Sequence, residues 1–140
     1  MKPWIIILVG VLALLWNTGG AFDYVMTQTK NEAYLAQFTA EERAYFDSFP
    51  AWVQGCWATA VWSAVLGSLL LIFRSGLSVA VYTVSIIAML VTFTHNFFLA
   101  ETKMHEMVGQ EAIYFTALIV VVAVALWLYA RWLKTKGAIS

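Results

Sequence analysis

The chain has 140 residues, of which 62% are hydrophobic and only 11% are charged. A soluble domain is about a quarter charged, so this composition excludes an ordinary water-soluble core. The formal net charge is zero, and the chain therefore carries no overall basic excess that would favour binding to nucleic acid.

Four apolar stretches are long enough to cross a bilayer, which takes about 20 helical residues. They cover about residues 3–24, 50–73, 77–99 and 110–133. The stretches are continuous rather than alternating, which favours helices over strands within hydrocarbon. We therefore predict an all-α integral membrane four-helix bundle of up-down-up-down topology, with residues 1–140 forming a single four-span transmembrane domain.

The distribution of cations predicts the orientation of this bundle. Five cations fall on the side of both termini and three on the other, namely Lys2, Arg74, Arg131, Lys134 and Lys136 against Lys30, Arg43 and Lys103. The positive-inside rule therefore places both termini in the cytoplasm, with the spans in an inner membrane. The competing interpretation is that Lys2 and the first apolar run form a secretory signal cleaved before Phe22.

The loop at residues 25–49 is the longest segment outside the predicted spans. Thr39 and Glu42 have the spacing of a capping box, and Phe49-Pro50 ends the helix that Thr39 begins. We predict a short amphipathic helix here, which lies on the outer membrane surface or caps the bundle. The alternative is an ordinary solvated loop helix.

The second span carries small residues at intervals of four. Such rows let two membrane helices approach closely, so we predict packing within the chain or between copies. The residues assigned to helix packing are Gly55, Thr59, Ser63, Gly67, Ala60 and Ala64.

The third span carries a polar stripe along one helix face, in alternating steps of four and three residues. Its members are Ser78, Tyr82, Ser85, Met89, Thr92 and Asn96. Polar groups avoid hydrocarbon, so we expect this face to meet other helices or a wet cavity.

Polar groups of all four spans are expected to converge on the outer half of the membrane, while the inner half is almost purely apolar. Asn17 lies about 20 Å along the first helix from Trp4, at 1.5 Å per residue. The candidate ligand-binding residues are Asn17, Asp23, Gln54, Thr92, His95 and Asn96. For Asn17 the alternative role is an interhelical hydrogen bond, and for His95 it is packing.

The sequence has no motif that places a nucleophile beside a base, so we expect no catalytic residues and no enzyme activity. Its single cysteine, Cys56, excludes an intramolecular disulfide and a cysteine-based zinc site. The stretch M-H-E-M, with Met104, His105 and Met107, resembles a soft copper-binding surface. No second such motif supports it, so we predict no metal centre and no cofactor.

The stretch W-N-T-G-G-A-F-D-Y-V-M-T-Q-T at residues 16–29, together with F-P-A-W at residues 49–52, resembles a group of short bacterial inner-membrane proteins. These have no assigned activity and often carry a sugar-transporter label. The resemblance covers roughly residues 13–99. The layout of four spans, a long first outer loop and a proline opening the second span is also similar to the DoxX-like group. Neither resemblance implies a set of catalytic residues.

The favoured hypothesis is a small accessory or interaction protein, embedded in the lipid bilayer as a homo-oligomer or as a subunit of a partner membrane protein. The alternative is a binder or transporter of a small polar solute through the outer polar cluster. Four spans leave no room for inverted repeats within one chain, so transport would require an oligomer. An oxidoreductase component that uses quinone or copper is a third hypothesis.

Overall fold

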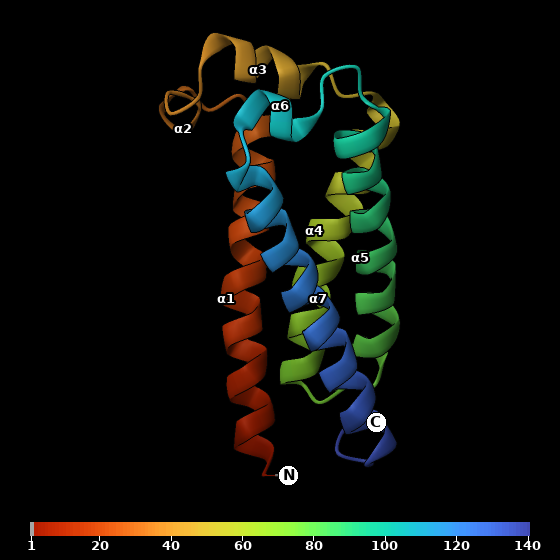
Figure 1. Cartoon of the computed structure of the whole chain (residues 1–140). Helices are drawn as coiled ribbons and strands as arrows, with labels where there is room; N and C mark the ends of the chain where they lie inside the picture. Colours follow the sequence, from red (N-terminus) through yellow and green to blue (C-terminus); the bar gives the residue numbers. More distant parts are fainter. Residues whose placement is uncertain (1) are drawn as a thin grey trace.

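The computed structural model describes residues 2–140, which form four long helices with a layer of short helices over one end (Figure 1). The long helices are α1 (Pro3–Gln28), α4 (Ala51–Ile72), α5 (Leu77–Thr94) and α7 (Glu111–Thr135). The short helices are α2 (Glu32–Leu35), α3 (Ala40–Asp47) and α6 (Met104–Val108), and a π-helical turn, η1 (His95–Leu99), extends α5. The predicted all-α four-helix class is confirmed.

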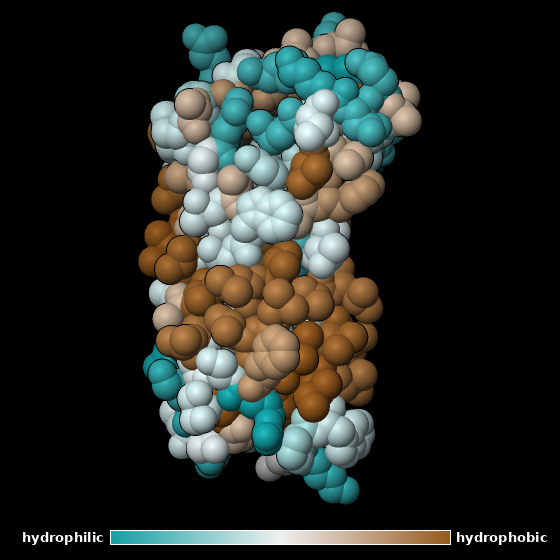
Figure 2. All heavy atoms as spheres, turned by 180° about the vertical axis from the view of Figure 1, so that it is seen from behind, coloured by the Kyte–Doolittle hydropathy of each residue, from teal (hydrophilic) through white to brown (hydrophobic). Residues whose placement is uncertain are grey.

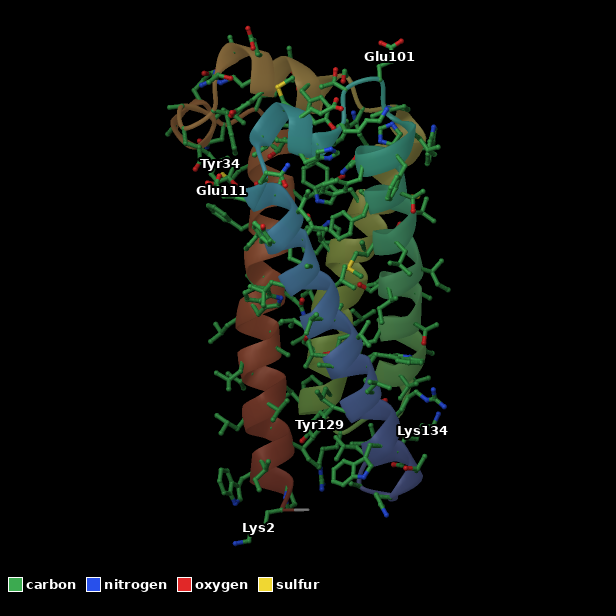
Figure 3. All side chains as sticks on the ribbon, in the orientation of Figure 1. Lys2, Tyr34, Glu101, Glu111, Tyr129 and Lys134 are labelled. Atoms are coloured by element: carbon green, nitrogen blue, oxygen red, sulfur yellow. The ribbon has the colours of Figure 1, made fainter. Side chains whose placement is uncertain are left out.

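The four long helices, with η1 included in the third, are each long and apolar enough to cross a membrane. Figure 2 shows a broad apolar band on the rear face, with polar side chains toward both ends of the molecule. Figure 3 places Glu101 at the end covered by the short helices and Lys2 and Lys134 at the opposite end, where both termini lie. These features together indicate a multi-pass membrane protein.

The long helices pack in chain order. Helix α4 packs along both α1 and α5, and the main partner of α7 among the long helices is α5. At the end near the termini all four contribute to one buried cluster, which contains Ile6, Leu71, Tyr82, Ala130, Leu133 and Ile139. Toward the short helices the side chains of α7 are mostly exposed. The bundle is therefore tightest at the end that carries the termini.

The short helices α2, α3 and α6 form a lid over the other end of the bundle (Figure 1). Helix α3 begins with the predicted capping box, in which Thr39 Oγ1 accepts from Glu42 N and Glu42 Oε2 accepts from Thr39 N. Its Tyr45 is buried with Phe49 and Val53, and methionines of α6 pack against this group. The loop helix therefore caps the bundle, which is one of the predicted arrangements.

The predicted polar stripe of α5 faces into the molecule. All six of its side chains, from Ser78 to Asn96, are buried. Ser85 Oγ donates to the carbonyl of Ala60 on α4 at 2.7 Å. Burial against neighbouring helices is what the cost of polar groups in hydrocarbon predicts, and the expectation for this face is confirmed.

The predicted small-residue row of α4 is divided between two environments. Gly67 is buried against α5, and a Cβ added there would lie 2.7 Å from the ring of Tyr82. Gly55 and Thr59 at the other end of the row are exposed, and a Cβ at Gly55 would meet nothing within 4 Å. Packing within the chain is therefore found at Gly67, whereas at Gly55 and Thr59 the other predicted arrangement, packing between copies, stays a prediction. Helices α1 and α5 flank α4 on other faces, so these two residues face outward.

Replacing Gly67 by alanine should destabilise the fold, because the new methyl group overlaps a buried and rigid aromatic ring. Overpacking of this kind costs about 1–3 kcal/mol, which outweighs the helix propensity that alanine adds. We expect Gly67→Ala to lower the free energy of unfolding by about 1–2 kcal/mol, measured by circular dichroism during SDS titration of mixed micelles. The matched control Gly55→Ala should change it by no more than about 1 kcal/mol, in the stabilising direction. Equal effects of the two substitutions would contradict this packing.

Candidate functional site

A chain of hydrogen bonds links three of the long helices. Asn17 Nδ2 of α1 donates to Ser68 Oγ of α4 at 2.9 Å, and Ser68 Oγ lies 3.0 Å from Tyr82 Oη of α5. Ser68 donates its own proton to the carbonyl of Ala64 at 2.9 Å, so Tyr82 is the donor to Ser68. A hydroxyl has one proton and two lone pairs. The Ser68 hydroxyl is therefore fully satisfied within the protein.

This geometry corrects the predicted position of Asn17. Its partner Ser68 lies about 21 Å along α4 from Gln54, at 1.5 Å per residue, toward the end that carries the termini. The reason is an offset between the helices. Gly10 of α1 already contacts Ile72, the last residue of α4, so the first turns of α1 extend beyond the end of α4 (Figure 1). Asn17 forms the alternative interhelical hydrogen bond and does not join the outer polar groups.

Asp23 connects α1 to the lid. Its Oδ1 accepts a hydrogen bond from the hydroxyl of Tyr34 on α2, and the rings of Tyr34 and Phe22 meet edge to face at 5.7 Å. Burial and, next, the hydrogen bond to the Asp23 carboxylate raise the pKa of Tyr34 above its ordinary value. Tyr34 therefore stays protonated and acts as a donor, and Asp23 holds the lid rather than lining an open pocket. Figure 3 shows Tyr34 in the lid.

His95 and Asn96 lie at the turn where α5 becomes π-helical. Both side chains are buried, and His95 Nδ1 is 3.0 Å from Asn96 Oδ1. Because an amide oxygen only accepts, Nδ1 carries the proton. The His95 ring also meets the rings of Phe49 and Trp52 edge to face at 5.7 and 5.5 Å. A single π-helical turn often marks a functional position in a helix.

The two remaining candidate ligand-binding residues bond to nearby backbone. Gln54 Nε2 donates to the carbonyl of Phe49 at 3.0 Å, across the proline that opens α4. Thr92 Oγ1 donates to the carbonyl of Ala88 in its own helix at 2.9 Å. Of the six candidate ligand-binding residues, only His95 and Asn96 form a hydrogen bond with each other. Asn17 forms its hydrogen bonds with α4, and Asp23 accepts its hydrogen bond from α2.

A small hollow does lie in the lid, but the candidate ligand-binding residues do not line it. Its volume is about 110 Å³, and its lining residues are Thr27, Lys30, Glu32, Leu35, Arg43, Phe46 and Asp47. Arg43 is part of its wall, with Nη1 3.2 Å from Glu32 Oε2 and Nε donating to the carbonyl of Leu35 at 2.9 Å. Arg43 thus connects α3 to α2 through Glu32 and the carbonyl of Leu35.

Two buried polar atoms near the junction of α3 and α6 have no hydrogen-bond partner. They are Tyr45 Oη and His105 Nδ1. Burial and, to a smaller extent, the Glu106 carboxylate raise the pKa of Tyr45, so its phenol stays neutral. The ring of His105 stacks on Phe97, with centroids 5.9 Å apart and planes 6° from parallel. Tyr45 was not among the predicted site residues, because in the sequence it fits the apolar face of the loop helix, whereas His105 belongs to the M-H-E-M stretch.

Within residues 2–140 no three side chains among His, Cys, Asp and Glu are grouped so that they could hold a metal ion. Comparisons with protein-family models, with curated proteins and with solved structures found no match.

The hydrogen bond between Ser68 and Tyr82 should have a measurable coupling energy in a double-mutant cycle. Interhelical hydrogen bonds in membranes contribute about 0.6–1.7 kcal/mol. Ser68→Ala and Tyr82→Phe should each destabilise the protein. The double mutant should be destabilised by less than the sum of the two single effects, and the difference should be about 0.6–1.7 kcal/mol. The control Thr94→Val removes a hydroxyl that bonds only within its own helix. Its cycle with Tyr82→Phe should give no coupling, and an equal coupling in both cycles would refute the assignment.

Proposed function

We propose that this chain is a small accessory protein of a bacterial inner membrane, and that it acts by packing a face of α4 against a transmembrane helix of another subunit. The observation that carries the proposal is a notch on the exposed face of α4. In the same proposal both termini lie in the cytoplasm and the lid lies outside. The excess of cations at the end with the termini supports that orientation.

The notch consists of Gly55 and Thr59 between two large side chains. Trp52, Gly55, Thr59 and Trp62 follow one helix face in steps of three and four, and the tryptophans are 52% and 48% exposed. Thr59 Oγ1 donates to the carbonyl of Gly55 at 2.8 Å, so the floor of the notch has no unpaired hydroxyl. The backbone of α4 is therefore open to close approach by another helix at this notch.

An apolar groove adjoins the notch, with Trp62 in its wall. It lies between α1 and α4 and has a volume of about 250 Å³. Its lining residues are Thr18, Ala21, Phe22, Val25, Trp62 and Val65. One side chain of a partner helix would fill such a groove while its backbone lay over Gly55. Membrane helices associate through this kind of close packing, since lipid is as apolar as their side chains.

Binding of a polar solute is less well supported by the same geometry. The six candidate ligand-binding residues bond to protein atoms at several separate places, and a solute would have to break those bonds before it could be held. A partner helix at the notch requires no such change. This contrast favours the accessory role over transport.

Gly55→Leu should weaken the association without unfolding the protein, because the leucine fills the notch and its Cβ meets no other atom of the chain within 4 Å. The measurement is gentle purification from native membranes, followed by native mass spectrometry of co-eluting proteins and of any oligomer. We expect the complex to be reduced at least tenfold. Gly19→Leu on α1 is the matched control, since a Cβ there also meets nothing within 4 Å.

An unchanged complex in Gly55→Leu would contradict the proposal. So would a wild-type chain that elutes alone and monomeric at every protein concentration tested. Equal loss of the complex in both variants would show that the effect is not specific to the notch, and it too would contradict the proposal.

A further inference from the structure

We propose that the seam between α5 and α7 holds a binding site for the headgroup of an anionic phospholipid. The seam lies at the end of the bundle that carries the termini, where Trp127 and Lys134 of α7 lie against Thr83 and Gly76 of α5. Arg131 and Lys134 bind the phosphate group, and Trp127 positions Arg131. This inference goes beyond the proposed accessory function and does not depend on it.

The guanidinium of Arg131 is held in place by a neighbouring ring. Its Cζ lies 4.8 Å from the centre of the Trp127 ring, which is a cation–π contact. Trp127 is itself fixed, because its Nε1 donates to Thr83 Oγ1 at 2.9 Å. The guanidinium is therefore preorganised, and its five N–H donors have no acceptor among residues 2–140.

Lys134 brings a second cation to the same seam. It lies three residues after Arg131 and seven after Trp127, so the three side chains share one face of α7. Its Cε and Cδ lie 3.3 and 3.5 Å from the position of a Cβ added at Gly76. The lysine stem therefore rests where glycine leaves room, at the start of α5. Figure 3 shows Lys134 beside α5 and Lys2 below α1, on the other side of the bundle.

No side-chain carboxylate neutralises these two cations. All eight Asp and Glu residues lie in the lid or next to it, and within the described chain the one ion pair joins Arg43 to Glu32. Arg131 belongs to the segment Glu111–Thr135, which is apolar enough to cross a membrane. A cation at the edge of hydrocarbon is costly unless it is paired. A phosphate group that pairs with Arg131 is therefore bound favourably.

The surroundings of the seam favour a lipid over a soluble anion. The ring of Trp132, next to Arg131, is 43% exposed, and exposed tryptophans mark the level of the headgroups. Toward the middle of the bilayer, Leu128 of α7 and Val84 of α5 are 52% and 49% exposed and offer an apolar surface to acyl chains. Basic groups between helix ends bind phospholipid headgroups, and the fork of an arginine matches two phosphate oxygens.

The competing explanation is a diffuse attraction between anionic lipid and every cation at this end of the molecule. It predicts that Lys2 matters as much as Lys134, and that a lysine can replace Arg131 without loss. A defined site requires the position and the planar shape of the guanidinium. Substitutions that preserve the charge therefore separate the two explanations.

The test uses the full chain in detergent micelles and native mass spectrometry with dioleoyl-phosphatidylglycerol and dioleoyl-phosphatidylcholine, which share their acyl chains and differ in net charge. We expect one phosphatidylglycerol to bind about tenfold more tightly than phosphatidylcholine. Arg131→Gln with Lys134→Gln should remove this preference, and Arg131→Lys should reduce it about threefold. The control Lys2→Gln should keep the preference of the parent. Circular dichroism verifies that every variant is folded.

Equal binding of the two lipids by the folded parent would overturn the proposal. So would an unchanged preference in Arg131→Lys, or a loss in Lys2→Gln as large as in Lys134→Gln alone, because both indicate diffuse attraction. Millimolar inorganic phosphate should leave the bound phosphatidylglycerol in place. Its displacement would assign the two cations to a soluble anion and contradict a lipid site.

Discussion

The structure depends on one contact within the membrane, where Tyr82 of α5 lies against Gly67 of α4. The missing side chain at Gly67 leaves room for the ring, and the ring's hydroxyl then reaches Ser68. Asn17 of α1 donates to the same Ser68 oxygen. In hydrocarbon a polar group without a partner costs several kcal/mol, since no water can replace the lost bond. One serine hydroxyl therefore fixes three helices relative to one another.

This contact explains why the two ends of the molecule differ. Helix α7 is attached at the same end, where Trp127 Nε1 donates to Thr83 Oγ1 at 2.9 Å and Ala130 and Leu133 are buried. The other end is closed by the lid, through the buried group of Tyr45, Phe49 and Val53. Between these two regions α4 keeps an exposed face. The surface that we propose for a partner helix lies away from the contact that stabilises the bundle.

Local sequence patterns predicted the helices and several of their faces. The lengths of the apolar stretches predicted the spans. The spacing of Thr39 and Glu42 predicted the start of α3, and the periodicity of polar residues predicted the buried face of α5. The position of Asn17 along the bundle axis could not be predicted in this way, because it depends on the axial offset between α1 and α4. That offset follows from the contact of Gly10 with Ile72, which joins distant parts of the chain. The outward direction of Gly55 likewise depends on which faces of α4 the neighbouring helices cover.

The central claim is that the chain crosses the membrane four times, with the lid on one side and the α4–α5 turn and both termini on the other. Maleimide labelling of single cysteines in intact cells tests it most directly, in a background where Cys56 is replaced by serine. Glu41→Cys and Glu101→Cys should react with an impermeant reagent, whereas Ser75→Cys and Lys136→Cys should react only after the cells are permeabilised. Labelling of Glu41→Cys together with Lys136→Cys in intact cells would contradict the account.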